Sequence, residues 1–210
     1  GYAILKDHHG PAQYLLIPTA RITGIESPLL LRAGAPNYFA AAWKARRFVG
    51  AALHHDLPRD AISLAINSMK GRSQEQLHIH IDCLREDVYT SIKNMLPGID
   101  AHWGVLPATL AGHRYRAIYL PGQELTTNPF ALVAATLTDP QAMGAQTLAV
   151  VGVDDARRGP GFVVLLDHSD LAHGDYGSAE ELQDHSCRIA GQSQWPATAS
   201  SSLSSTGTSR

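Results

Sequence analysis

Residues 77–83, LHIHIDC, constrain the fold of this chain more than any other stretch, because apolar and polar side chains alternate there without exception. Successive side chains of a β-strand point to opposite faces, so the alternation predicts a half-buried strand. One face carries Leu77, Ile79, Ile81 and Cys83, and the other carries Gln76, His78, His80 and Asp82. The sequence therefore predicts a sheet with its core on one side of this strand and a row of hydrogen-bonding groups on the other.

Short apolar runs elsewhere predict further strands, and turn residues separate them in pairs. The runs are residues 2–6, 14–18, 61–68, 146–153 and 162–170. Strands joined by short turns favour antiparallel pairing. The predicted fold class is therefore α+β, an antiparallel sheet with helices packed on it.

Capping residues mark the predicted helices. Asn37 is a good N-cap for a helix that runs to about residue 53, and Gly98 closes a helix predicted over residues 87–96. Asn128 and Pro129 open a short helix. Ser178 and Glu181 form a capping-box pattern, which predicts a final helix over about residues 179–190.

Strand pairs occur in both halves of the chain, about one half-length apart. We interpret this as a degenerate duplication within one domain of residues 1–190. Residues 1–100 are the catalytic half, and residues 101–190 are a second half that has lost the histidine motif. Residues 191–210 are rich in Ser and Thr and almost uncharged, which predicts a disordered tail.

The charge and hydropathy of the chain exclude several classes of function. The net charge is -2 and the pI is about 6.6, so no basic field is available to hold nucleic acid as a partner. No apolar run approaches the roughly 18 residues of a membrane span. The sequence begins at Gly1 without an initiator Met, so an upstream signal or anchor segment is not excluded. We expect the only two cysteines, Cys83 and Cys187, to be either disulfide-bonded or both buried.

The two neighbouring histidines admit three interpretations. A solvent-facing sheet surface explains the polarity but not the choice of two imidazoles. A metal centre at His78, His80 and Asp82 is the second, because HxHxD resembles the HxHxDH box of metallo-β-lactamase-type hydrolases. Cys83 stands where that box has its last His, and a further ligand would have to come from elsewhere. The third interpretation rests on the residues that precede the pair.

Residues 67–81, NSMKGRSQEQLHIHI, resemble the signature of the histidine triad superfamily of nucleotidyl hydrolases and transferases. That signature is H-x-H-x-H with apolar x, preceded by a Gly, a Ser/Gln pair and a strand that ends in Asn. Matching positions are held by Asn67, Gly71 and Ser73, and the three triad places by Gln76, His78 and His80. Gln76 thus replaces the first triad histidine. The resemblance implies that the middle residue, His78, is the nucleophile.

One branch of the superfamily is a closer match. Residues 1–30 and 61–88, with the shorter blocks GHRY, NPFALVA and SAEELQDHSCRI, resemble the CDP-diacylglycerol pyrophosphatase family. The resemblance covers Gly1 to about Ile189. It implies hydrolysis of CDP-diacylglycerol to CMP and phosphatidate. It also implies a bacterial inner-membrane enzyme with its domain on the periplasmic side, held at the membrane surface by an N-terminal segment that is absent here.

The resemblance also implies roles for the triad places. His78 presents one ring nitrogen to phosphorus, and a main-chain carbonyl orients the other; attack gives a nucleotidyl-histidine that water then cleaves. His80 binds a non-bridging oxygen or assists proton transfer. Gln76 can donate an amide hydrogen to the phosphate but cannot carry a proton.

Four further residues are candidates for binding the substrate. Asn67 and Ser73 supply neutral donors, while Lys70 and Arg72 in the connecting loop are candidates to meet the developing charge. With charge handled by imidazoles and donors, no metal or other cofactor is required. For the lipid half, Leu29 to Leu31 are better explained as core than as an acyl groove.

Three alternatives stay open. The first is another nucleotidyl hydrolase or transferase that uses the same nucleophile on a soluble nucleotide. The second is a metal-dependent hydrolase at His78, His80 and Asp82. The third is a nucleotide-binding module that has lost catalysis through the change at Gln76. Among the remaining histidines, His113 is the better candidate for a ligand contact, and His185 is interpreted as structural.

Overall fold

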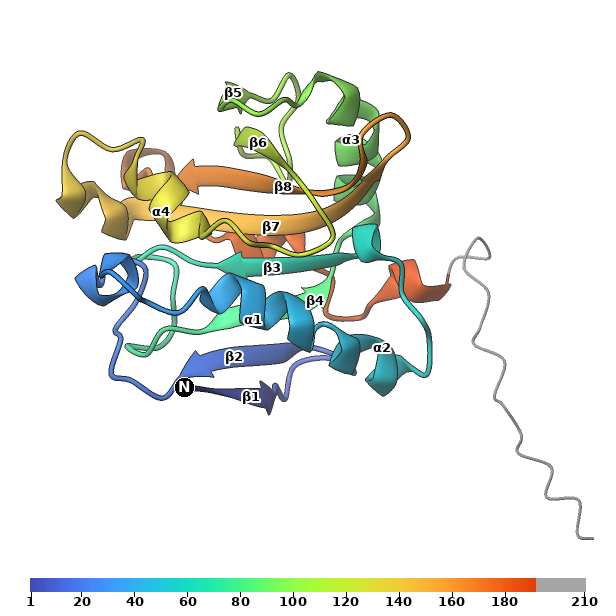
Figure 1. Ribbon diagram of the computed structural model, residues 1–210, viewed down its shortest axis with the longest axis horizontal. Helices are drawn as coiled ribbons and strands as arrows, with labels where there is room; N and C mark the ends of the chain where they lie inside the picture. Colours follow the sequence, from blue (N-terminus) through green and yellow to red (C-terminus); the bar gives the residue numbers. More distant parts are fainter. Residues whose placement is uncertain (192–210) are drawn as a thin grey trace, which may run out of the picture.

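Eight strands form one antiparallel sheet in the computed structural model, which describes residues 1–191 (Figure 1). The strand order is β1-β2-β4-β3-β7-β8-β6-β5. The first four strands are β1 (Tyr2–Lys6), β2 (Tyr14–Pro18), β3 (Ile62–Ile66) and β4 (Ile79–Cys83). The last four are β5 (Gly104–Val105), β6 (Arg116–Pro121), β7 (Gln146–Asp155) and β8 (Gly159–His168). The predicted antiparallel α+β architecture agrees with this arrangement.

The two halves of the chain meet at the centre of the sheet, where β3 pairs with β7. Counted inward from its own edge, each half has the same order: β1-β2-β4-β3 in the first and β5-β6-β8-β7 in the second. The catalytic strand predicted from the sequence, β4, therefore lies between β2 and β3, with a hairpin edge on one side and the rest of the sheet on the other.

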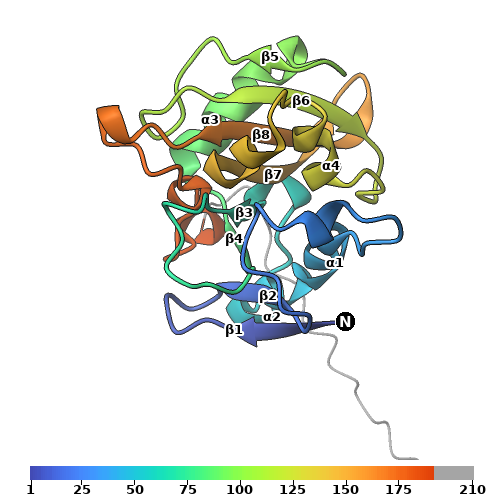
Figure 2. The same cartoon turned by 90° about the vertical axis from the view of Figure 1, so that its left-hand side faces the viewer.

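Helices cover both faces of the sheet, but different parts of it (Figure 2). Helices α1 (Tyr38–Ala45), α2 (Arg47–Leu53) and α4 (Pro129–Ala134) pack on one face, and α3 (Glu86–Met95) packs on the other. Alternating strand residues divide between two apolar clusters accordingly. Ile79 and Ile81 join α1 and α2, whereas Ala149 and Leu165 join α3. Within residues 1–191, none of the helices is long and apolar enough to cross a membrane.

Two predictions of local structure were wrong. The helix expected from Asn37 to residue 53 is interrupted at Arg46, which separates α1 from α2. The final helix expected over residues 179–190 is replaced by two 3₁₀ turns, Ala179–Leu182 and Arg188–Gly191. Ser178 does not cap a helix, because its hydroxyl donates to Asn67 Oδ1. The tail expected over residues 191–210 lies, from residue 192 on, outside the described residues.

A disulfide joins Cys83, the last residue of β4, to Cys187. Both side chains are buried, so the expectation for the two cysteines is confirmed. The backbone reinforces the link, since Asp184 N–H donates to the carbonyl of Cys83. The C-terminal segment is thereby held against the end of the strand that carries His80.

Candidate active site

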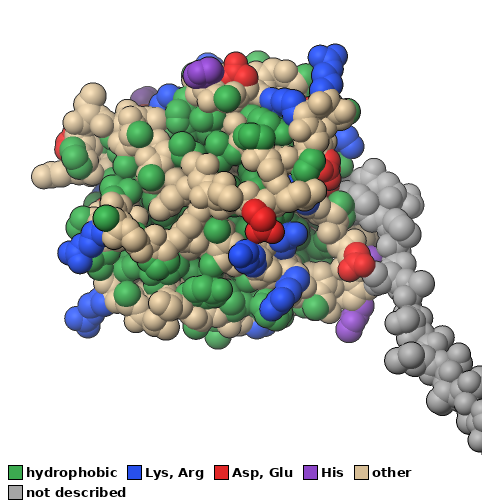
Figure 3. All heavy atoms as spheres, in the orientation of Figure 1, with side chains coloured by type: hydrophobic (Ala, Val, Ile, Leu, Met, Phe, Trp, Pro, Cys, Tyr) green, Lys and Arg blue, Asp and Glu red, His purple; other side chains and the backbone are tan. Residues whose placement is uncertain are grey.

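A cleft of about 540 Å³ opens where β1, β2 and β4 lie side by side, on the face of the sheet that α1 and α2 do not cover. Its lining includes His78, His80 and Glu180. A larger hollow of about 730 Å³ lies over α2 on the opposite face, where cationic side chains gather (Figure 3). That hollow is remote from the histidine motif. We therefore take the smaller cleft, where the two imidazoles of the motif meet, as the candidate active site.

His78 lies just before β4 and is held by its own backbone. Its Nδ1 is 2.8 Å from the main-chain oxygen of Gln76. A carbonyl only accepts, so Nδ1 carries the hydrogen and Nε2 keeps its lone pair. The side chain is half-buried and lines the cleft. This orientation leaves the Nε2 lone pair of His78 without a backbone partner and free for a ligand in the cleft.

His80 is almost fully buried, and its ring stands edge-on to that of His78 with the centroids 4.9 Å apart. Gln13 Nε2 lies 2.9 Å from His80 Nδ1 and 3.2 Å from Glu180 Oε1. An amide oxygen facing that carboxylate would be repelled, so the amide nitrogen stands there and donates to both groups. Glu180 Oε1 also lies 3.2 Å from His80 Nδ1, but the Gln13 amide nitrogen is closer and has only hydrogens to offer, so we assign Nδ1 as the acceptor and place the ring hydrogen on Nε2.

The Nε2 atom of His80 is buried and has no hydrogen-bond partner among the described residues. Burial lowers the pKa of His80 to about 4, against the attraction of Glu180, so the ring is neutral near pH 7. A neutral imidazole with a free N–H can donate a hydrogen bond to an anionic oxygen bound next to His78.

Glu180 comes from the C-terminal 3₁₀ turn and is fixed to the end of β3. Asn67 Nδ2 donates to Glu180 Oε2 (3.1 Å), and the Glu180 N–H donates to Asn67 Oδ1 (3.2 Å). Sequence reasoning missed Glu180 and Gln13 as site residues. Glu180 lies 113 residues from Asn67 in the chain, and the capping-box pattern around it indicated a helix instead.

Asp82 does not join the two histidines. Its fully buried carboxylate accepts from His185 Nδ1 (2.8 Å) and from the backbone N–H of Cys83 (2.8 Å). Burial raises the pKa of Asp82, and the bond to Asp82 raises the pKa of His185. Among residues 1–191, the groups of side chains close enough to share an ion do not include His78 or His80. The geometry therefore does not favour the HxHxD metal centre.

The predicted substrate-binding residues do not all face the cleft. The side-chain amide of Gln76 donates its two hydrogens to the main-chain oxygens of Pro18 (2.9 Å) and Ala20 (3.0 Å), so neither hydrogen is free to bind a phosphate. Ser73 is exposed and lines the cleft. Asn67 is buried and holds Glu180 rather than facing the cleft.

The two predicted loop cations lie outside the lining of the cleft. Arg72 is engaged with Glu26 (2.6 Å) and Glu75 (2.9 Å), and it borders a small cavity next to His78. Lys70 is exposed. His113, the other candidate for a ligand contact, pairs with Asp175 (2.7 Å) away from the cleft.

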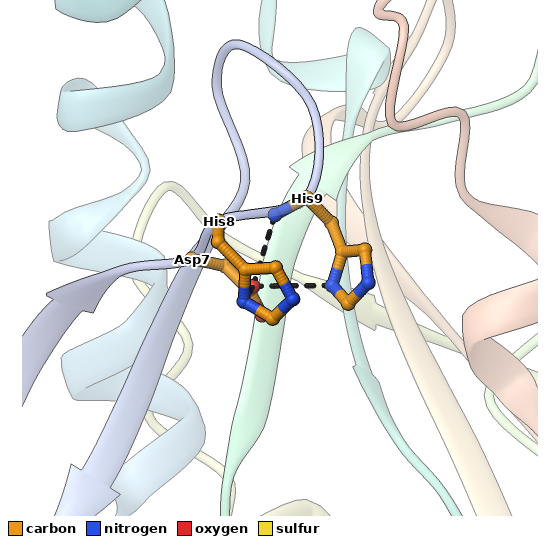
Figure 4. A group of neighbouring side chains, drawn as sticks. All are labelled: Asp7, His8 and His9. Atoms are coloured by element: carbon orange, nitrogen blue, oxygen red, sulfur yellow. Dashed lines mark hydrogen bonds and ion pairs between the residues drawn. The ribbon is translucent and has the colours of Figure 1, made fainter.

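The turn between β1 and β2 forms the rim of the cleft (Figure 4). Asp7 Oδ1 lies 3.0 Å from Nδ1 of His8 and 3.2 Å from Nδ1 of His9. Burial raises the pKa of Asp7, but hydrogen bonds and charge from His9 and His8 outweigh it, and the pKa is lowered overall. Asp7 therefore stays ionised and orients both rings, while Lys6 adds a cation at the same rim.

Comparison with known families shows which family of enzymes the chain belongs to. A family model described as CDP-diacylglycerol pyrophosphatase matches residues 1–191, the whole of the described chain. The chain belongs to the CDP-diacylglycerol pyrophosphatase family. It is accordingly a hydrolase that acts on the pyrophosphate bond of CDP-diacylglycerol.

Proposed function

We propose that the enzyme cleaves CDP-diacylglycerol to CMP and phosphatidate through a nucleotidyl-histidine formed on His78. The observation that carries the proposal is the 2.8 Å bond from His78 Nδ1 to the carbonyl of Gln76, which points the Nε2 lone pair away from the backbone. Neutral imidazole is a competent nucleophile near pH 7, and a covalent intermediate divides one difficult displacement into two easier ones.

The two steps balance as follows. The Nε2 lone pair of His78 attacks the cytidylyl phosphorus, the bond to the bridging oxygen breaks, and phosphatidate leaves with those electrons. Water then attacks the same phosphorus from the side the leaving group vacated, the P–N bond breaks, and CMP leaves as the water gives its proton to solvent. The Nδ1 hydrogen stays on the ring throughout, so the Gln76 carbonyl stabilises the positive charge of the intermediate.

His80 serves both steps as a neutral donor. Its Nε2–H donates to a non-bridging oxygen as negative charge develops there. Gln13 acts through His80 by donating to Nδ1, which keeps the ring hydrogen on Nε2, and Glu180 holds the Gln13 amide in that orientation. A metal ion is not needed for this scheme.

We also infer a histidine-triad-like fold that arose by duplication, with residues 101–190 as the degenerate half. His80 pairs with Ala65, Ala65 with Ala149, and Ala149 with Leu165. Leu165 in β8 therefore stands at the place of His80 in β4. Because Leu165 cannot donate or accept a hydrogen bond through its side chain, it supports the inference that the second half keeps the strand arrangement of the first half but has no catalytic histidine.

A periplasmic site at the bacterial inner membrane is proposed for the enzyme. The disulfide between Cys83 and Cys187 supports an oxidising compartment. The substrate is a membrane lipid, which supports association with the membrane surface. Detection of the native protein in periplasmic or membrane fractions, and not in the cytosolic fraction, tests this assignment.

Hydrolysis of CDP-diacylglycerol by the wild type, His78→Ala and the control His102→Ala tests the function, with CMP and phosphatidate measured. His102 is exposed and lies outside the cleft, so its loss should leave the rate unchanged. Loss of the nucleophile should lower kcat at least about a thousandfold. Equal rates in wild type and His78→Ala, or full inhibition by a chelator, would contradict the mechanism. Turnover of soluble CDP-esters alone would contradict the lipid substrate.

A further inference from the structure

The sheet continues for two strands beyond β4, and on the catalytic face these strands carry apolar side chains. Leu5 of β1 pairs with Leu15 of β2, and Leu15 pairs with His80. One row of side chains thus runs from the sheet edge to the catalytic imidazole. Ile17 lies in the neighbouring row, opposite Ala3. These four apolar residues, Ala3, Leu5, Leu15 and Ile17, are called the apolar strip.

The apolar strip is open, whereas the same place in the other half is covered. Leu5 is 53% exposed, and Leu15 and Ile17 are half-buried in the cleft lining. In the second half, Ala117 of β6 pairs with Leu165 as Leu15 pairs with His80, and Ala117 is only 2% exposed because the cluster around α3 covers it. Within residues 1–191, no protein layer covers the apolar strip that adjoins His78.

We propose that the apolar strip binds the diacylglycerol half of the substrate. The inference rests on the proposed function, because the occupant is the lipid part of the molecule cleaved at His78. The lining of the cleft combines the polar side chains of Ser73, Gln74 and Gln76, from the segment before β4, with Leu5, Leu15 and Ile17 of β1 and β2. A pyrophosphate bound at His78 then has polar groups for its nucleotide end and apolar groups for its lipid end.

The rim of the cleft at the end of β1 fits the same orientation. Lys6, His8 and His9 line the cleft beside Leu5, at the end of β1. The phosphate that leaves with the lipid then meets Lys6 while its acyl chains lie along the apolar strip. Residues 28–31, the other apolar run near the N-terminus, do not line the cleft, and Leu30 is buried in the core.

The test compares two substrates on one set of variants. The ratio of kcat/KM for CDP-dioleoylglycerol in mixed micelles to kcat/KM for CDP-glycerol is measured for wild type, Leu5→Gln, Leu5→Met and Val105→Gln. Val105 is a matched control, 59% exposed on the opposite edge strand, β5. We expect Leu5→Gln to lower the ratio about tenfold, Leu5→Met to keep it, and Val105→Gln to leave it unchanged.

An unchanged ratio in Leu5→Gln overturns the proposal, as does an equal fall in Val105→Gln. A binding measurement with dioleoyl phosphatidate micelles needs no turnover and so keeps the test independent of activity. The affinity should be about tenfold weaker in Leu5→Gln than in wild type. A wild type that binds phosphatidate but hydrolyses no CDP-diacylglycerol contradicts the proposed function alone. If Leu5→Gln instead changes only the oligomeric state, the apolar strip is an interface between copies and the proposal fails.

Discussion

Removal of the disulfide between Cys83 and Cys187 is expected to lower the free energy of unfolding by 4 to 5 kcal/mol as an order-of-magnitude estimate. The bond spans a sequence separation of 104 residues. For a loop of about 100 residues, the loss of unfolded-state entropy corresponds to about 4.7 kcal/mol at 25 °C. In a chain of this size, each kcal/mol lowers Tm by roughly 2–4 °C, so a fall of about 8–20 °C follows.

Urea unfolding of wild type and the double variant Cys83→Ala/Cys187→Ala, followed by tryptophan fluorescence, measures the difference. The single variant Cys187→Ala is the internal control, because it also breaks the disulfide and should lower the free energy of unfolding by nearly as much. Activity should fall as well, since the bond holds the segment that carries Glu180 against β4. A double variant within about 1 kcal/mol of wild type would refute the reasoning that the bond stabilises by restricting the unfolded chain.

Three further predictions concern single residues. Glu180→Gln should lower kcat about ten- to a hundredfold with little change in KM, and Glu180→Asp should recover part of the loss; steady-state kinetics with unchanged kcat would remove Glu180 from the site. Because burial lowers the pKa of His80 to about 4, the unfolded chain takes up a proton there first as the pH falls below the ordinary value of 6.5. The contribution of neutral His80 to the free energy of unfolding is fully present above pH 6.5 and is lost as the pH falls toward 4. Between these pH values, the free energy of unfolding should therefore fall by up to ~3 kcal/mol more in wild type than in His80→Gln. Parallel curves of stability against pH for the two proteins would contradict this prediction. Gly152→Ala should cost at least about 2 kcal/mol, because its Cβ would overlap the Trp43 ring, and wild-type Tm in this variant would contradict the packing.

The strands were predictable because they depend on local patterns. The alternation at residues 77–83 placed Ile79 and Ile81 in the core and His80 on the other face, as the structure does. The same local reasoning failed at Ser178 and Glu181. Their side chains bond Asn67 and Tyr115 from distant parts of the sheet, and these contacts replace the helix cap that the pattern indicates.

The candidate site was only partly predictable for the same reason. The motif indicated His78 itself, and the resemblance implied a main-chain carbonyl behind it; the structure identifies that carbonyl as the one of Gln76, two residues earlier. Gln13 and Glu180 lie 67 and 100 residues from His80 (180 − 80 = 100), and only the folded sheet brings them together. The apolar strip could not be predicted either, because the sequence shows Leu5 and Leu15 as ordinary strand residues and does not show that their face of the sheet is uncovered.

The stereochemical course at phosphorus tests most directly whether His78 carries the nucleotide. A P-chiral analogue of CDP-diacylglycerol with sulfur on the cytidylyl phosphorus is hydrolysed in ¹⁸O-labelled water, and the configuration of the CMP thiophosphate is determined. Two in-line displacements, first by His78 and then by water, predict overall retention. Inversion would show a single direct attack by water and would contradict the covalent mechanism.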